Sequence, residues 1–184
     1  MTINGKAAYV CYVSPSRVNA LLPVEVEEGP GIVQVSRSEL TSAPVTIQVK
    51  RAAPGLFLLD PETRRYVIAT HADGSLVGKT SLYPGVSTPD RPGEIVVLRG
   101  AGFGATSPAV PAGELLTAPA YLVAIPTVTI GGVPAETRFA GLSSTGLYQL
   151  NVVVPQGLSG GDAAVMVDVE GARTQDNVFM TIRR

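Results

Sequence analysis

The sequence has no tryptophan, and its 184 residues include one cysteine, Cys11, and one histidine, His71. One cysteine cannot form a disulfide within the chain, and in its apolar segment Cys11 is expected to be a small buried strand residue. One histidine cannot build a histidine-based metal cluster, and no Gly-x-Ser-x-Gly turn accompanies it as in a hydrolase. We therefore expect no catalytic residues, no metal site and no cofactor.

Charge is scarce as well. Charged residues make up 16% of the chain, the formal net charge is −1, and the basic residues are scattered. Binding to nucleic acid requires a basic surface that displaces counterions from phosphates. No apolar stretch approaches the ~18 residues of a membrane helix, and residues 1–15 lack the basic start and apolar segment of a signal peptide. The sequence thus predicts neither a nucleic-acid partner nor membrane insertion.

Residues that favour turns and strands are abundant instead. The chain contains 20 glycines and 15 prolines, and roughly a quarter of its residues are valine, isoleucine or threonine. Short alternating apolar segments are separated by Gly/Pro turns throughout. This pattern predicts an all-β protein.

An internal repeat relates the two ends of the chain. Thr2–Ala8 matches Thr129–Ala135, and Asn19–Pro23 matches Asn151–Pro155, with five more residues between the matching segments in the second copy. We predict that 1–50 and 129–184 superpose strand for strand, with Asn19 over Asn151 and Pro23 over Pro155. Each asparagine is expected to be structural, its amide bonding to the backbone of an adjacent loop.

The region between the repeats supplies further strands. Asp73-Gly74 between two apolar segments predicts a hairpin. From residue 95 onward the pattern predicts seven strands, the number in an immunoglobulin-like sandwich: 95–99, 121–124, 128–130, 135–140, 147–154, 163–169 and 177–183. Gly100, Gly102 and Gly104 superficially resemble a phosphate-binding loop, but no helix-forming segment follows them, so we interpret them as structural turn residues.

Three segments resemble a known family: Ile95–Gly104, Val128–Ala135 and Gly146–Pro155. They are similar to bacterial IPT/TIG immunoglobulin-like domains, and in particular to paired C-terminal modules of large secreted proteins of soil bacteria. The resemblance implies an extracellular β-module without catalytic residues.

The expected architecture is a tandem of immunoglobulin-like β-sandwich modules, the first incomplete at its N-terminus. We assign 1–56 to the first repeat, 57–92 to a connecting hairpin and linker, and 93–184 to the second repeat. The first copy lacks a counterpart of 93–108, so it is either cut short or degenerate. Its open strand edge would be covered by the 57–83 hairpin and the second module, or by another copy of the protein in self-association.

The expected function is a non-catalytic structural or interaction module, acting as a spacer, a surface-display element or an adhesion module. It would belong to a larger exported bacterial protein, secreted or at the cell surface, and contact other domains of that protein or a protein or polysaccharide ligand. The alternative is an accessory polysaccharide-binding domain of a secreted enzyme, which an exposed row of tyrosines would favour, formed from Tyr12, Tyr66, Tyr83 or Tyr121. We interpret Glu25, Glu27 and Glu28 as a charged strand edge rather than a calcium site.

Overall fold

The computed structural model describes residues 1–59 and 66–183. In this part of the chain there are twenty-one strands, joined in four sheets, and no helix. The all-β prediction is confirmed. With no helix in the described residues, no helical segment there could cross a membrane.

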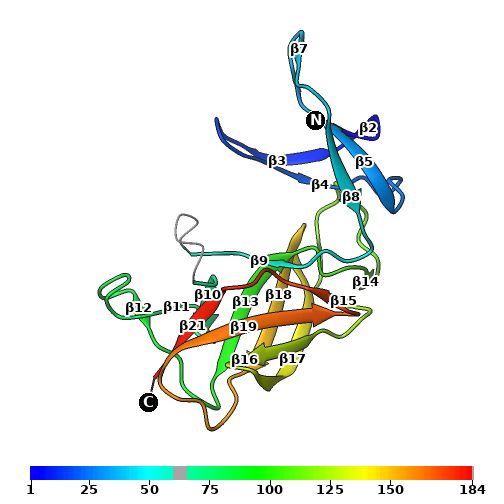
Figure 1. The fold of residues 1–184 in the computed structure, drawn as a ribbon. Helices are drawn as coiled ribbons and strands as arrows, with labels where there is room; N and C mark the ends of the chain where they lie inside the picture. Colours follow the sequence, from blue (N-terminus) through cyan, green and yellow to red (C-terminus); the bar gives the residue numbers. More distant parts are fainter. Residues whose placement is uncertain (60–65, 184) are drawn as a thin grey trace.

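Residues 1–50, the N-terminal unit, form a small group of strands at one end of the molecule (Figure 1). The strands are β1 (Thr2–Ile3), β2 (Lys6–Ala7), β3 (Tyr9–Val13), β4 (Val18–Leu21), β5 (Gly29–Gln34), β6 (Ser36–Arg37), β7 (Leu40–Thr41) and β8 (Val45–Val49). Its buried apolar core is only Ile3, Val26 and Val49. So small a core gives this unit little apolar stabilisation of its own.

Residues 51–183, the C-terminal unit, hold the main core. The strands are β9 (Gly55–Leu56), β10 (Ala69–His71), β11 (Leu76–Val77), β12 (Ser87–Thr88), β13 (Ile95–Ala101), β14 (Thr106–Ser107), β15 (Ala120–Leu122), β16 (Thr127–Ile130), β17 (Val133–Ser144), β18 (Leu147–Val153), β19 (Gly161–Val169), β20 (Ala172–Arg173) and β21 (Phe179–Ile182). A strand lies at each of the seven predicted positions.

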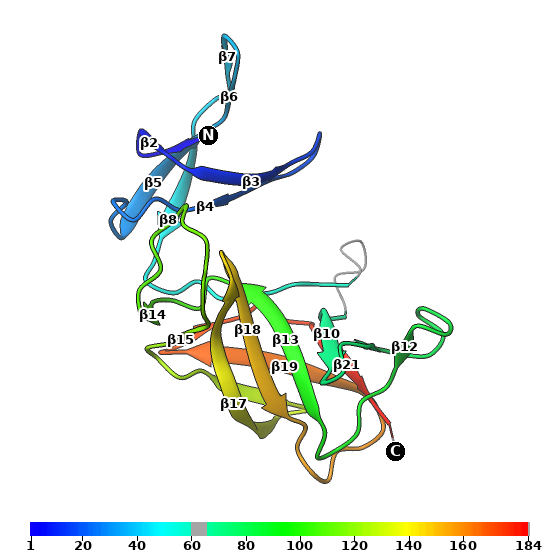
Figure 2. The same cartoon turned by 180° about the vertical axis from the view of Figure 1, so that it is seen from behind.

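The strands of the C-terminal unit lie in two layers that share one core. β13, β18 and β17 run side by side, and β19 pairs with β16 and β21. β19 crosses in front of β13 and β18 in Figure 1 and behind them in the reverse view of Figure 2. Fully buried side chains from both layers, such as Leu98 and Leu150 from one and Ile130 and Val167 from the other, belong to a single apolar cluster.

The segment before β13 joins the sheet of the C-terminal unit. The hairpin predicted at Asp73-Gly74 is confirmed, since β10 and β11 pair antiparallel on either side of it. β10 also pairs with β13, and β9 pairs with the far end of β13. The expected packing of the 57–83 hairpin on the N-terminal unit is therefore not what the described part of this segment shows.

Strand pairings in the two ends of the chain correspond residue for residue. Ile3 pairs with Lys6 and Val33, as Ile130 pairs with Val133 and Val165. Gly29 pairs with Val49 as Gly161 pairs with Ile182. In the β3–β4 and β17–β18 hairpins, Asn19 faces Tyr12 and Asn151 faces Phe139, next to a register shift at the same place.

Local details of the backbone correspond too. Gly29 and Gly161 have φ of 125° and 122°, and Ser38 and Glu170 have φ of 52° and 51°. The hydroxyl of Ser42 accepts a hydrogen bond from Val35 N at 3.1 Å, as that of Thr174 does from Val167 N at 3.1 Å. The hairpin between β17 and β18 is five residues longer than the one between β3 and β4, counted from Phe139–Asn151 and Tyr12–Asn19.

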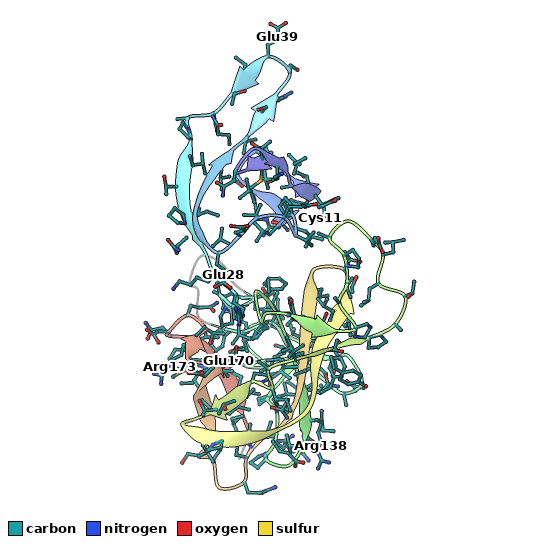
Figure 3. All side chains as sticks on the ribbon, turned by 90° about the vertical axis from the view of Figure 1, so that its right-hand side faces the viewer. Cys11, Glu28, Glu39, Arg138, Glu170 and Arg173 are labelled. Carbon is teal, nitrogen blue, oxygen red and sulfur yellow. The ribbon has the colours of Figure 1, made fainter. Side chains whose placement is uncertain are left out.

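The two ends differ at one edge. β18 lies between β17 and β13, with Leu98 opposite Leu150 and Val96 opposite Val152. β4, which corresponds to β18, has β3 as its only described partner. Cys11 is exposed, and the prediction that it is buried is wrong (Figure 3). It occupies the unpaired position at the register shift between Val10 and Tyr12, as the exposed Arg138 does between Thr137 and Phe139.

Gly100, Gly102 and Gly104 lie where the chain leaving the N-terminal unit crosses β13. Ala53 N donates to Gly102 O at 2.9 Å, and a Cβ on Gly102 would overlap the carbonyl oxygen of Ala53. A Cβ on Gly100 would overlap the carbonyl oxygen of Gly55. The first two glycines therefore permit close approach of two backbones, and Gly102 and Gly104 also have positive φ.

Gly102→Ala should destabilise the chain by roughly 2–4 kcal/mol, because left-handed strain adds to a backbone overlap. The matched control is Gly132→Ala, where φ is similar, +79° against +76°, but no atom lies within 4 Å of the added Cβ. The control should cost only about 1 kcal/mol. Urea unfolding of both variants measures the difference, and equal costs would contradict the role given to Gly102.

Candidate functional site

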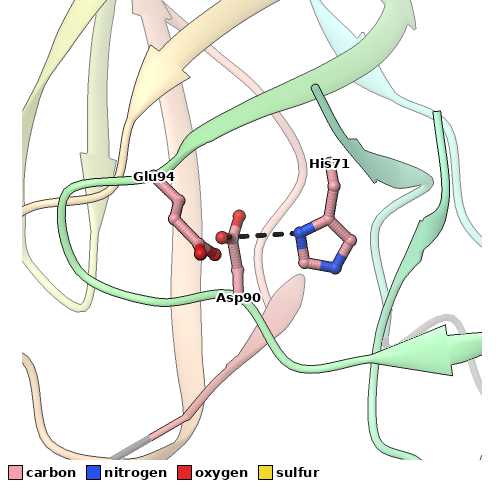
Figure 4. A group of neighbouring side chains, drawn as sticks. All are labelled: His71, Asp90 and Glu94. Carbon is pink, nitrogen blue, oxygen red and sulfur yellow. Dashed lines mark ion pairs between the residues drawn. The ribbon is translucent and has the colours of Figure 1, made fainter. Parts of the chain in front are cut away.

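In the described residues, one group of histidine and acidic side chains lies close enough together to hold a metal ion: His71, Asp90 and Glu94 (Figure 4). His71 is the last residue of β10, while Asp90 and Glu94 flank the turn that leads into β13. His71 Nδ1 lies 3.7 Å from Asp90 Oδ1. The backbone of Asp90 is fixed against β21, with Asp90 N donating to Thr181 O at 3.0 Å and Arg183 N donating to Asp90 O at 2.7 Å.

The carboxyl group of Asp90 is fully buried, which makes its charged form costly. Burial and the neighbouring Glu94 carboxyl raise the pKa of Asp90 to about 6. The hydrogen bond from Asp90 lowers the pKa of Glu94. Within the described chain no group donates a hydrogen bond to Asp90 Oδ2. Below about pH 6 these features favour a protonated Asp90, with one proton shared between its carboxyl group and that of Glu94.

Thr88, His71 and Asp90 follow one another in the order hydroxyl, imidazole, carboxylate, which is the order of a catalytic triad. His71 Nε2 lies 2.9 Å from Thr88 Oγ1. A catalytic relay requires the carboxylate to accept a hydrogen bond from the imidazole, and 3.7 Å between Nδ1 and Oδ1 is too long for one. Below its raised pKa Asp90 is also the acid form, which favours donation over acceptance. The arrangement therefore joins β10 to the β12–β13 connection, and its geometry does not activate Thr88.

An imidazole nitrogen and two carboxylate oxygens are also the ligand types that divalent cations take. The three ligand atoms lie within 4.8 Å of one another, whereas ligands at ~2.1 Å from one ion lie roughly 3–3.5 Å apart. A cation would therefore have to displace the shared proton and contract the turn at Asp90.

The sequence does not predict this group. It predicts an exposed His71 before the Ala-Asp-Gly turn, but the side chain is half-buried, and Thr88, Asp90 and Glu94 lie close to it. The pairing of β10 with β13 brings Asp90 and Glu94 to His71, and the pairing of β11 with β12 brings Thr88 there. No residue spacing in the sequence reveals these pairings.

The asparagines predicted as structural residues differ in environment. Asn151 is half-buried, and its Oδ1 accepts from Gln149 Nε2 at 2.8 Å; Gln149 in turn accepts from Arg99 at 2.6 Å. This side-chain chain links β18 to β13, in place of the expected bond to loop backbone. Asn19 is exposed. Pro23 is buried beside the turn in which Val26 N donates to Pro23 O, whereas Pro155 is half-buried.

A groove separates the two units. It has a volume of about 500 Å³, and its walls include Ala20 and Leu22 on one side and Val110 and Tyr148 on the other. The units touch where Leu21 packs directly on Gly146 and the ring of Tyr9 on Gly113. The lining is largely apolar, so the groove would suit an apolar rather than a charged occupant.

The tyrosines do not form the row that a sugar platform would need. Tyr66 is buried. Tyr12, Tyr83 and Tyr121 are exposed but lie on β3, before β12 and on β15, at separate places in Figure 1. The guanidinium of Arg17 lies over the ring of Tyr12, 4.9 Å from its centroid.

The acidic cluster is not on a strand. Residues 22–28 form an irregular connection with a turn at Val24–Glu25, and Glu28 pairs with Arg51 at 3.2 Å. Figure 3 shows Glu28 near the junction of the two units.

Comparisons with protein-family models, curated proteins and solved structures give no match.

Asp90→Asn should raise the stability of the chain at pH 8 by about 1–3 kcal/mol. An acid whose pKa is higher in the folded state binds more protons when folded, so its contribution to stability falls as pH rises from about 4 through about 6. The amide cannot ionise and still has an N–H to donate toward Glu94. Thermal unfolding from pH 4 to pH 8 should show a smaller pH dependence over this range than in the wild type.

Asp176→Asn, at an exposed carboxylate, is the control for removal of one negative charge. A wild-type pH dependence retained in Asp90→Asn would contradict the shared proton. Repeating the series with equimolar Zn²⁺ distinguishes a cation site, which would raise the wild-type midpoint at pH 8 but not that of the variant.

Asn151→Ala should lower the free energy of unfolding by about 1 kcal/mol, because the amide of Gln149 loses its acceptor. Gln149 is the residue that Arg99 of β13 contacts on β18. The same substitution at the corresponding exposed position, Asn19→Ala, should change the free energy of unfolding by less than about 0.5 kcal/mol. Equal losses in chemical denaturation would contradict the stabilising role given to the Asn151 hydrogen bond.

Proposed function

We propose that this chain is a non-catalytic structural and interaction module built from two copies of one immunoglobulin-like β-sandwich unit, the first without part of its second layer. It would act as a spacer, display or adhesion element in a larger exported protein, secreted or at the cell surface. The resemblance of Ile95–Gly104 and Gly146–Pro155 to IPT/TIG domains supports the family and the location. The matching strand registers support the duplication.

The observation that carries an interaction role is a set of apolar side chains left exposed in the N-terminal unit. Their counterparts in the C-terminal unit form its core. The exposed fractions are 59% for Val45 against 1% for Val178, 37% for Ile47 against 2% for Met180, 40% for Val35 against 0% for Val167, and 39% for Leu22 against 0% for Val154.

The difference has one physical cause. In the C-terminal unit the layer containing β13 covers these positions, and Val96 and Leu98 lie in the same buried cluster. In the N-terminal unit no described strand takes that place. Apolar side chains held on one sheet face gain several kcal/mol when a partner covers them, at about 25 cal/mol per Å² buried. This uncovered face, Leu22, Val35, Val45 and Ile47, is the surface through which the module would bind other domains or itself.

An accessory polysaccharide-binding role has less support. Sugar binding in such domains depends on aromatic rings presented together. The exposed tyrosines lie on separate elements, and the uncovered face is aliphatic.

The test compares one substitution at matched positions. Ile47→Ser should leave the free energy of unfolding within about 0.5 kcal/mol, whereas Met180→Ser should cost about 2–5 kcal/mol. The wild-type chain should gain mass with concentration in light scattering and bind an apolar-surface dye, and Ile47→Ser should weaken both. A wild-type chain that is monomeric and binds no dye, or an Ile47→Ser loss as large as that of Met180→Ser, would contradict the proposal.

A further inference from the structure

The open edge of β4 has a defined set of hydrogen-bonding groups. Ser14 N donates to Arg17 O at 2.8 Å, which closes the β3–β4 hairpin with a bonded pair. Antiparallel ladders alternate, so the next pair, Val13 and Val18, is not bonded, and Asn19 bonds to β3. The N–H and C=O groups of Val18 and Ala20 therefore point away from β3.

The corresponding groups of β18 point at β13. Val154 N donates to Glu94 O at 2.9 Å, and Gly93 N donates to Val154 O at 2.8 Å. By the same alternation the main chains of Val152 and Leu150 face Val96 and Leu98, their partners across the ladder. Val18 and Ala20 correspond to Leu150 and Val152 through the matched hairpins.

From this correspondence we infer that β4 is an acceptor for an added β-strand, and that the strand binds antiparallel to β4 in the register that β13 takes on β18. The inference rests on the proposed interaction role and names its partner: an extended peptide segment with apolar side chains at alternate positions, like Ile95–Ala101. A leucine would lie opposite Val18 and a valine opposite Ala20. Both side chains would point to the uncovered face, where they would contact side chains such as Ile47.

The groove provides the place for this strand. It runs along Ala20, Leu21 and Leu22, and is closed on the far side by the Val110–Ala112 segment. Its lining near β4 carries no acidic or basic side chain other than Lys50 and Arg51 at the end of β8. An uncharged, alternating apolar strand meets no buried charge there.

The probe is a synthetic peptide with the sequence of residues 94–101, added to the full chain. In amide hydrogen exchange followed by NMR, the peptide should slow exchange at Val18 and Ala20. Exchange at Asn19 and Leu21 should change little, because their amides already face β3. Protection at Asn19 and Leu21 instead, or at none of the four, would overturn the inference.

Two N-methylated peptides of equal composition test the register. Methylation at the nitrogens corresponding to Val96 and Leu98 removes the donors that face β4, and should weaken binding about tenfold or more. Methylation at those corresponding to Val97 and Arg99 leaves these donors intact, and that peptide should bind as the parent does. Equal affinity of the two methylated peptides would overturn the inference.

Ala20→Pro in the chain gives an independent check, since proline is tolerated at an edge position whose N–H faces solvent. The variant should keep the wild-type unfolding midpoint but lose peptide binding. If the peptide fails to bind while Ile47→Ser still reduces self-association, the strand register is wrong and the proposed interaction role stands. If Ile47→Ser does not change self-association while the peptide binds in register, β4 accepts a strand and the uncovered face is not the surface of self-association.

Discussion

The pairing of β13 with β18 is the interaction on which the rest of this molecule depends. It places Val96 and Leu98 over Leu150 and Val152, and all four side chains are almost completely buried. β13 also carries β10 on its other edge and, through β9, the chain that arrives from the N-terminal unit. Without this strand the C-terminal unit would be left with the same small core and exposed aliphatic face that the N-terminal unit has.

The two units therefore act as an internal comparison. Sequences folded in the same register have different burial because one has a covering strand and the other does not. The buried hydrogen bond from Val167 N to Thr174 Oγ1 and the exposed one from Val35 N to Ser42 Oγ have the same length of 3.1 Å. The geometry of this hydrogen bond is thus the same in both units. Its contribution to stability depends on whether the second layer of strands buries it.

Local sequence patterns were sufficient to predict much of the fold. Alternating apolar residues and Gly/Pro turns located the strands from Ile95 onward, and Asp73-Gly74 located a hairpin, because period-2 patterns and positive φ are local properties. The burial of Cys11 was predicted wrongly because regular alternation was assumed, whereas Cys11 lies at a register shift of the β3–β4 hairpin. The His71 group was not predicted, since its members come from the ends of β10, β12 and the turn before β13 and meet only through pairing.

The position of β13 in the chain also has a consequence for synthesis on the ribosome. Its partner β18 begins 46 residues after β13 ends, whereas β4 and the rest of the N-terminal unit precede β13. The strand pairings of the N-terminal unit all lie within its own 50 residues, so its sheets can form early, while the C-terminal unit needs β21 at the far end to pair with β19. If β4 accepts a strand as inferred above, its edge is available to newly made β13 before β18 has been synthesised, and β13 has to leave that edge to reach its place in the final structure.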